Sequence, residues 1–261
     1  MEELREKLQT AWVAKQIYSY EEIDSTNTET RRLSLKGVEQ GLVVMAEKQI
    51  AGKGRRGRTW ESPAGENLYF SILLRPELSP QKAPMLTLIM AYSVAKVLLD
   101  EGLPVQIKWP NDLVLSKKKV CGILTEMHLQ GSRVEDVVIG VGINVNTTKF
   151  PKEIRDKATS IYMETGNKLT RDLLLQKVLA EFQEQYEEFL NVQDLSLLKE
   201  SYNQILINRN QEVMVLEPGG MYKAEALGIN ETGELVVKKA DGDIESVFAG
   251  EVSVRGLYGY V

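Results

Sequence analysis

Residues 52–60 read GKGRRGRTW and contain the residue types best suited to holding an anion. Four cations lie between and beside the three glycines of this stretch: Lys53, Arg55, Arg56 and Arg58. Glycine allows unusual backbone angles and close approach, whereas neighbouring cations repel one another unless an anion lies among them. A basic RNA-binding tract and a solvated surface loop have the same composition, so the loop alone leaves those alternatives open.

Three other stretches could contribute to the same chemistry. EIDSTN (22–27) either caps a helix or binds a ligand, because its hydroxyl and amide groups can satisfy free backbone N–H groups. KWPNDL (108–113) places a lysine and a carboxylate near one strand end, where they could orient an amine or a phosphate, or serve a turn. GVGINVN (140–146) sets two glycines and Asn144 in a strand-like run, which indicates either a bulge or close approach of a ligand.

The composition is that of an ordinary globular protein. The chain has 261 residues, 43% of them hydrophobic and 26% charged, which is enough for one main domain and a small second one. A net charge of -5 argues against general attraction to nucleic acid, so the basic loop is a local feature. The single cysteine, Cys121, cannot form an internal disulfide, and no apolar stretch has signal-peptide or membrane-span length. We therefore expect a cytoplasmic protein.

Hydrophobic periodicity predicts the elements that position these motifs. Helices are predicted at 25–37, 83–102, 170–190 and 195–206, with one short amphipathic helix within residues 1–20. Strands are predicted at 41–49, 66–75, 105–109, 112–115, 119–127 and 135–145. The last four strands are too close together for crossover helices, so the sheet is expected to be largely antiparallel.

A second domain is predicted at the C-terminal end. Beyond Asn208 the helical period vanishes, and strand-length segments follow that are broken by Gly, Asn and Asp. This is about the amount of chain that a small β-barrel uses. We place the boundary near 207–211, which gives domains of residues 1–208 and 209–261.

Taken together and in this order, DSTN, GKGRRGR followed by Trp60, KWPNDL, KVCGIL and GVGINVN resemble the biotin protein ligases, from about Glu22 to the C terminus. The resemblance implies an α/β (α+β) fold: a mixed, largely antiparallel sheet with helices, related to class II aminoacyl-tRNA synthetases, followed by an SH3-like barrel. It implies that biotin and ATP, with Mg²⁺, form biotinyl-5'-AMP. The biotinyl group then passes to a lysine of a biotin carboxyl carrier protein or domain.

The resemblance also assigns site residues. The residues assigned to biotin binding are Ser25, Thr26, Asn27, Gln49, Gly52, Lys53, Gly54, Arg55 and Lys119. The residues assigned to ATP or adenylate binding are Arg55, Arg56, Gly57, Arg58, Trp60, Asn111 and Asn144. The catalytic residues are Lys119, which pairs with the biotin carboxylate, Asp112, which positions or deprotonates the incoming amine, and Arg55. No protein ligand is assigned to a metal, and Lys53 stands where the commonest family loop has arginine.

The resemblance makes the carboxylase carrier the expected partner. The short segment before the first motif predicts no specific DNA binding, and no membrane association is expected; a homodimer joined through sheet edges is a candidate assembly. Two rival functions are retained: a lipoate or octanoate ligase or transferase of the same superfamily, and an RNA-binding module that uses the basic loop and the terminal barrel.

Overall fold

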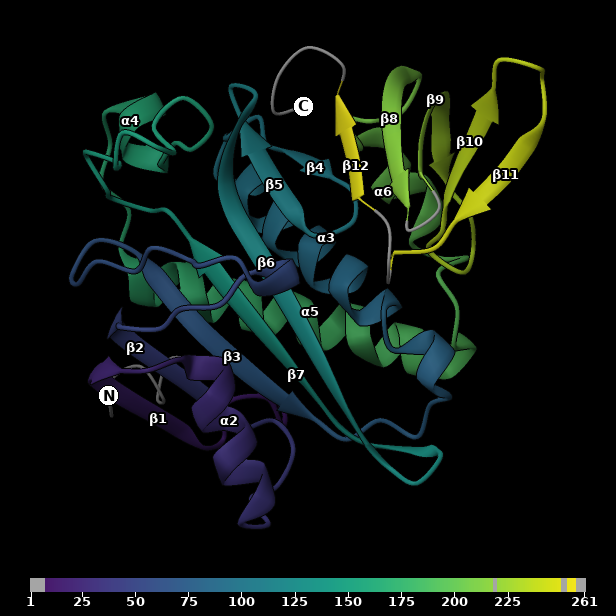
Figure 1. Ribbon diagram of the computed structural model, residues 1–261. Coiled ribbons are helices and arrows are strands. Elements are labelled where there is room, and N and C mark those ends of the chain that lie inside the picture. Colours follow the sequence, from purple (N-terminus) through teal and green to yellow (C-terminus); the bar gives the residue numbers. More distant parts are fainter. Residues whose placement is uncertain (1–7, 218–219, 250–252, 257–261) are drawn as a thin grey trace.

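The computed structural model describes residues 8–217, 220–249 and 253–256, and its larger sheet has seven strands in the order β1-β2-β3-β7-β6-β5-β4 (Figure 1). The strands are β1 (Ile17–Ile23), β2 (Val43–Gln49), β3 (Leu68–Leu74), β4 (Gln106–Lys108), β5 (Asp112–Leu115), β6 (Lys118–Gln130) and β7 (Arg133–Ile143). Strands β1 and β2 run parallel, and the other neighbouring pairs run antiparallel. The prediction of a mixed, largely antiparallel sheet is confirmed.

Helices cover both faces of this sheet. They are α2 (Thr26–Leu35), α3 (Met85–Asp100), α4 (Ile161–Thr165), α5 (Arg171–Val192) and α6 (Lys199–Gln204). Helices α3 and α5 belong to the larger apolar core, whereas α2 contributes Leu33 to a smaller one. The helical segment Pro80–Asp100, which contains α3, is long and apolar enough to cross a membrane, but it is buried along most of its length as the core helix of a globular domain.

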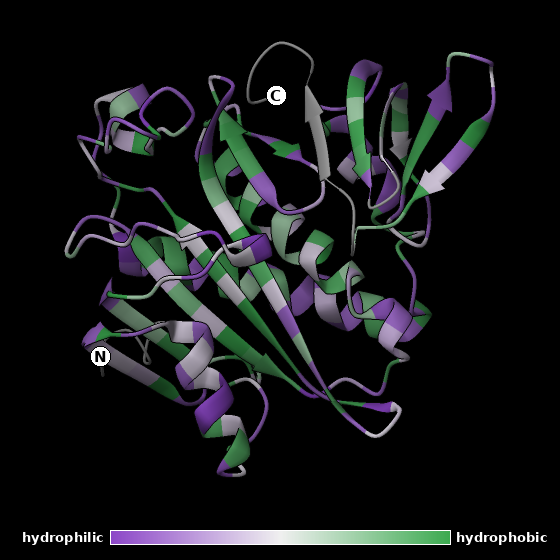
Figure 2. Ribbon diagram, in the orientation of Figure 1, coloured by the Kyte–Doolittle hydropathy of each residue, from purple (hydrophilic) through white to green (hydrophobic). Residues whose placement is uncertain are grey.

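Strand periodicity separates the two cores. In β3, Ile72 belongs to the larger core and Leu73 to the smaller one, and in β7 the same holds for Val137 and Val138. Successive side chains of a strand point to opposite faces, so each of these strands is apolar on both faces. Figure 2 shows the resulting hydrophobic runs along the central strands. Val138 of β7 shares the smaller core with Leu33 of α2, so the even-numbered positions of β7 face α2. The candidate site lies on that face of the sheet.

The C-terminal strands form a second, five-stranded antiparallel sheet in the order β11-β10-β9-β8-β12. They are β8 (Gln211–Glu217), β9 (Gly220–Ile229), β10 (Leu235–Lys239), β11 (Ile244–Val247) and β12 (Ser253–Gly256). This sheet packs on the first domain: Trp109 Nε1 donates to the Gly233 carbonyl at 3.0 Å, and Asn203 Oδ1 accepts from the Ile229 N–H at 2.7 Å. The KWPNDL motif is thereby fixed by both domains.

The predicted N-terminal helix is partly wrong. Residues 1–7 lie outside the described residues, 8–16 form turns, and Ile17–Ile23 is strand β1. Residues Ile17–Ile23 form a strand instead of a helix because their backbone pairs in parallel with β2 and the side chain of Ile17 is buried. Sequence periodicity also missed α4, and it made α6 longer than the six residues observed.

Candidate active site

A bare strip of three glycines forms the floor of the site. Gly140 and Gly142 lie two residues apart on the α2 side of β7, and Gly122 of β6 pairs directly with Gly142. A Cβ atom at Gly142 would lie 2.6 Å from the Trp60 indole, and one at Gly122 would lie 2.7 Å from the same ring. The Asn27 amide oxygen lies over Gly140 so closely that no side chain fits there. The glycines therefore allow Trp60 and Asn27 to lie directly on the sheet.

A cavity of about 50 Å³ lies over this floor. The predicted site residues that line it are Ser25, Thr26, Asn27, Gln49, Lys53, Gly54, Arg55, Trp60, Asn111 and Lys119. They come from α2, β2, the 52–60 loop, the β4–β5 turn and β6, so the fold brings four separated motifs together.

One wall of the cavity is a network of short polar contacts around Gln49. Gln49 Oε1 accepts from the Thr26 N–H at 2.8 Å and from its hydroxyl at 3.2 Å, and Gln49 Nε2 donates to Ser62 Oγ at 2.9 Å. Ser25 begins α2 as its N-cap residue, but its side chain makes no capping hydrogen bond. Capping therefore does not explain the buried Ser25 hydroxyl, which lines the cavity instead.

The basic loop forms a narrow ribbon over the opposite side of the cavity. The Gly54 N–H donates to the Arg58 carbonyl at 2.7 Å, and the Trp60 N–H donates to the Gly52 carbonyl at 2.9 Å. A 3₁₀ turn at Arg55–Gly57 closes the ribbon, with Arg56 in the left-handed region at φ 57°. The ribbon holds Trp60 against the glycine floor.

Arg55 ties this loop to both domains. Its guanidinium donates to Asn111 Oδ1 at 3.0 Å and to the Ala249 carbonyl at 2.7 Å. Asn111 is itself fixed, because its Nδ2 donates to the Ile123 carbonyl at 2.9 Å. Burial lowers the pKa of Arg55, and the nearby Asp112 carboxylate opposes that effect. An arginine with this environment still remains protonated at neutral pH.

Lys119 and Asp112 form the charged centre of the site. Their side chains make an ion pair with Nζ and Oδ1 2.5 Å apart, and the Lys119 ammonium lies 5.1 Å from the centroid of the Trp60 ring. The β5–β6 pairing shifts register between Leu113 and Val114, which places Val114 opposite Lys119. A cation held by one carboxylate and one aromatic face can exchange that carboxylate for another anion.

The remaining predicted residues lie around the cavity without lining it. They are Gly52, Arg56, Gly57, Arg58, Asp112 and Asn144. Gly52 allows close approach, since a Cβ there would lie 2.9 Å from Ser62 Oγ. Asn144 Nδ2 donates to the Thr159 carbonyl at 3.0 Å, so its side chain fixes the segment that follows β7. Arg56 and Arg58 lie at the tip and side of the loop, and both are exposed.

Sequence reasoning missed several residues that support the cavity. Ser62 holds Gln49, Ser71 lies 2.6 Å from Asn27 Oδ1, and Glu126 accepts from Asn27 Nδ2 at 2.7 Å. Gly122 belongs to the KVCGIL motif, but the sequence predicted no binding or structural role for it. Gly122 pairs with Gly142 because of the register between β6 and β7, and that register could not be predicted from the sequence.

Comparisons with known proteins agree with this geometry. Residues 19–144 match the biotin/lipoate A/B protein ligase family, and residues 210–255 match the biotin protein ligase C terminal domain. The bifunctional ligase/repressor BirA of Bacillus spizizenii is 35% identical over 97% of this chain and 78% of that protein. The biotin--[acetyl-CoA-carboxylase] ligase of Paracoccus denitrificans is 36% identical over 55% of this chain and 62% of that protein.

A solved structure extends the likeness to the fold. Biotin protein ligase from Aquifex aeolicus in complex with biotin and ATP superimposes with a TM-score of 0.80 and 32% identity. The match covers 93% of this chain and 99% of that chain. From the family models, the identity over nearly the whole chain and the shared fold, the chain belongs to the biotin/lipoate A/B protein ligase family, among its biotin protein ligases.

Proposed function

We propose that the cavity binds biotin and the α-phosphate of ATP, forms biotinyl-5'-AMP, and then biotinylates a lysine of a biotin carboxyl carrier protein. The observation that carries this proposal is the meeting of Lys119, Arg55 and the Gln49 wall around one glycine-floored cavity. The related Aquifex structure contains biotin and ATP, which supports the same substrates here.

The polar wall is the proposed site for the biotin ring system. The ureido group of biotin has both donors and acceptors, and Ser25, Thr26, Asn27 and Gln49 offer hydroxyl and amide groups that match them. The ribbon of residues 52–60 borders the same space, since Lys53, Gly54 and Arg55 also line the cavity. The backbone of Gly52 to Gly54 would then close over the ring.

The first reaction step needs cations where charge develops. A biotin carboxylate oxygen attacks the α-phosphorus of ATP, the bond from that phosphorus to the bridging oxygen breaks, and pyrophosphate leaves. We assign Lys119 to the biotin carboxylate and Arg55 to the α-phosphate, because both cations line the cavity. Fixed cations in a site closed to water stabilise such charge more than they would in bulk solvent. Arg56, Gly57, Arg58, Trp60, Asn111 and Asn144 complete the proposed nucleotide site.

The second step needs a group that accepts a proton. The carrier lysine amine attacks the carbonyl carbon of the mixed anhydride, the bond to the phosphate oxygen breaks, and AMP leaves. We assign Asp112 to orient this amine and to receive its proton. The Asp112 carboxylate is available for that role once the biotin carboxylate has taken its place beside Lys119.

Mg²⁺ is proposed to arrive with ATP. The described residues contain no group of three or more His, Cys, Asp or Glu side chains that could hold a metal ion. A protein-built magnesium cage therefore does not fit this site, and phosphate oxygens and water are the expected ligands. No step of the mechanism is assigned to the ion.

The wider assignments follow from the proposed reaction. The catalytic domain comprises residues 1–208 and the SH3-like barrel residues 209–261, with Arg55 and Trp109 joining them. We place the enzyme in the cytoplasm, with a carboxylase carrier as its partner and homodimerisation through sheet edges as an assembly to test. The proposed activity does not include operator binding, although the Bacillus relative is named as both a ligase and a repressor.

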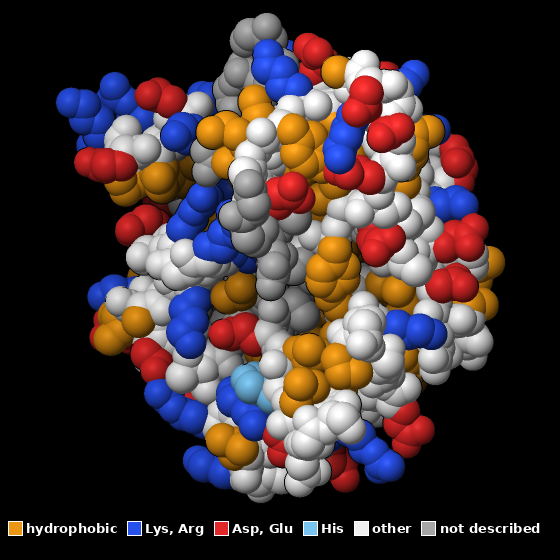
Figure 3. All heavy atoms as spheres, turned by 45° about the vertical axis from the view of Figure 1, so that its right-hand side comes forward, with side chains coloured by type: hydrophobic (Ala, Val, Ile, Leu, Met, Phe, Trp, Pro, Cys, Tyr) orange, Lys and Arg blue, Asp and Glu red, His pale blue; other side chains and the backbone are white. Residues whose placement is uncertain are grey.

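One incubation tests the central proposal. The protein is mixed with ATP, Mg²⁺ and labelled biotin, and biotinyl-5'-AMP and pyrophosphate are measured, with lipoic and octanoic acids in parallel. Activity with biotin supports the proposal, whereas activity only with the other acids supports the lipoate or octanoate alternative. The RNA-binding alternative predicts steeply salt-dependent RNA affinity. Against it, the face in Figure 3 carries interspersed acidic and basic side chains instead of one continuous basic surface.

A further inference from the structure

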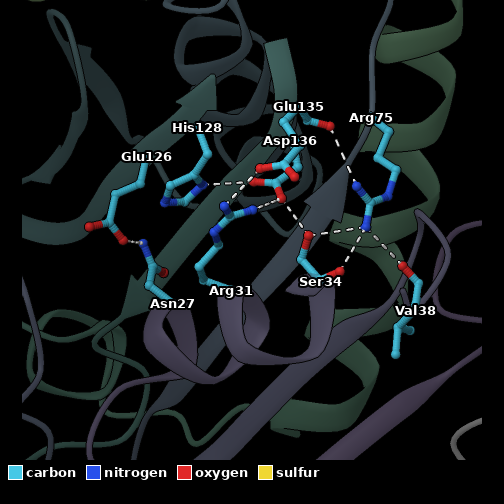
Figure 4. A network of polar contacts seen from close by, with 9 residues as sticks. All are labelled: Asn27, Arg31, Ser34, Val38, Arg75, Glu126, His128, Glu135 and Asp136. Atoms are coloured by element: carbon cyan, nitrogen blue, oxygen red, sulfur yellow. Dashed lines mark hydrogen bonds and ion pairs between the residues drawn. The ribbon is translucent and has the colours of Figure 1, made fainter. Parts of the chain in front are cut away.

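Two groups of polar contacts lie between α2 and the sheet (Figure 4). We call the two groups together the polar seam, and its members are Asn27, Arg31 and Ser34 of α2, Glu126 and His128 of β6, and Asp136 of β7. The three α2 residues are spaced by four and three positions, so they share one helix face. Asn27 and Glu126 form the group next to the cavity, and Asp136 with its three partners forms the second group.

The Asn27 side chain amide has a fixed orientation in the group next to the cavity. Its Nδ2 donates to Glu126 Oε2 at 2.7 Å and to the Leu124 carbonyl at 3.2 Å. A carboxylate and a carbonyl can only accept hydrogen bonds, so the amide cannot be turned over without placing two oxygens against Asn27 Oδ1. Glu126 supplies the shorter and charged contact of the two.

The opposite end of that amide faces the cavity floor. Asn27 Oδ1 lies over Gly140 and within 2.6 Å of the Ser71 hydroxyl, which also lies 2.7 Å from Thr26 Oγ1. Ser71 has one hydroxyl proton, so it can donate at most one hydrogen bond to Asn27 Oδ1. A carbonyl oxygen accepts two hydrogen bonds, so Asn27 Oδ1 can take a second one from a ligand N–H.

We propose that Glu126 is a positioning residue that sets the acid specificity of this ligase by holding Asn27 as a hydrogen-bond acceptor toward a ureido N–H of the substrate. The proposal rests on the proposed function. An acid such as lipoate or octanoate has no ring N–H to satisfy this oxygen, and a site built around a buried polar group rejects a ligand that leaves that group unpaired. Glu126 reaches the substrate only through Asn27.

The test compares Glu126→Met with Glu126→Gln. Methionine keeps the length of the side chain and removes the acceptor, so the Asn27 amide can turn over; glutamine can still accept through its amide oxygen. For Glu126→Met we expect the KM for biotin in pyrophosphate exchange to rise roughly 10- to 100-fold while kcat stays within about threefold. Glu126→Gln should restore the KM to within about fivefold of the wild type.

Two further arms separate positioning from a merely structural role. In an Asn27→Ala background, Glu126→Met should add no further loss of biotin affinity, because a residue that acts through Asn27 loses its effect with it. His128→Ala removes a contact with Asp136 in the second group of the polar seam, and we expect a lower melting temperature with an unchanged KM. Additive losses in the double variant, or an equal rise in KM for His128→Ala, would overturn the proposal.

The wild-type arm distinguishes this proposal from the proposed function. If the wild-type enzyme does not adenylate biotin at all, the proposed function fails before Glu126 is tested. If the wild type adenylates biotin and folded Glu126→Met does so with an unchanged KM, the positioning role alone is wrong. Should Glu126→Met not fold, the comparison of Glu126→Gln with Glu126→Asp, whose shorter side chain cannot reach Asn27, gives the same discrimination.

Discussion

Lys119 and Asp112 form an ion pair of 2.5 Å at the edge of the cavity, with side chains only 24% and 15% exposed. Each therefore serves as the counter-ion of the other before a substrate is bound. In the proposed mechanism, a biotin carboxylate would replace Asp112 as the partner of Lys119, and the freed Asp112 carboxylate would then serve the second reaction step. Separate variants of the two residues should affect different steps.

Lys119→Ala should impair the first step. Loss of one charge-assisted contact costs about 1.5 to 3 kcal/mol, which corresponds to roughly 10- to 150-fold in biotin affinity or adenylation rate. The matched control is Lys118→Ala, one position earlier in β6 and hence on the opposite face of the strand. Both rates are measured by pyrophosphate exchange. An unchanged rate and affinity in folded Lys119→Ala would remove this lysine from the mechanism.

Asp112→Asn should separate the two steps. The neutral amide no longer competes for Lys119, so biotin adenylation should be retained within about threefold. Transfer to the carrier lysine should fall roughly 100-fold or more, because general base catalysis contributes about that much. Single-turnover transfer from preformed biotinyl-5'-AMP measures the second step alone. Equal losses in both steps would show that Asp112 acts only by positioning Lys119.

Much of the site was predictable because its motifs are local in the sequence. The 52–60 loop, the STN segment and the KWPNDL turn contain their chemistry within a few residues. The supporting contacts were not predictable, because they depend on register. Glu126 meets Asn27 only because α2 lies on the even-numbered face of β7, and that helix orientation is set by packing of Leu33 rather than by any local motif.

Strand β1 shows that part of the fold, too, could not be predicted from local sequence patterns. Its sequence IYSYEEI follows a segment with helical charge patterning, and its parallel pairing with β2 is a long-range choice that local periodicity does not reveal. The ends of α2 and α3, in contrast, were predictable from the local sequence, because Gly37 and Gly102 were expected to end these helices. Both lie just after those helices with positive φ, where glycine is the least strained residue.

Gly142→Ala should push the Trp60 indole off the cavity floor. The added methyl would lie 2.6 Å from the ring, and overpacking of this kind costs about 1 to 3 kcal/mol of stability. The ring responds by moving, so ligand affinity should also change. In a Trp60→Ala background the same glycine substitution should cost much less, because the ring is absent. Thermal unfolding and biotin titration of the four proteins check this, and additive effects would contradict it.

Cys121 should be inert in the folded enzyme. Burial raises the pKa of its thiol well above the ordinary range, and the thiol lies in the larger core. Because the thiolate is the reactive form, a raised pKa leaves almost none at neutral pH. We expect no alkylation by iodoacetamide at pH 8 until denaturant is added, and one modified thiol afterwards. Rapid modification of the native protein, measured by mass spectrometry, would contradict the buried position.

Arg55→Gly should loosen the loop and release the activated intermediate. In the wild type the Arg55 guanidinium bridges Asn111 and the Ala249 carbonyl, so it fastens the ribbon across both domains. Without Arg55 the ribbon loses these two contacts, while its remaining cations still repel one another. Biotinyl-5'-AMP, no longer covered, should then diffuse away and acylate exposed lysines on other proteins.

Two substitutions serve as controls for this prediction. Arg55→Lys keeps the charge, but a point ammonium cannot bridge the two acceptors as a planar guanidinium does, so it should show an intermediate effect. Thr59→Gly adds a glycine to the same ribbon and leaves the Arg55 contacts in place, so it should release little intermediate. The measurements are biotin incorporation into albumin and the rate of proteolysis at residues 55–58, each with and without biotin and ATP. If Arg55→Gly forms biotinyl-5'-AMP normally but labels albumin no more than Thr59→Gly does, the bridge is not what retains the intermediate.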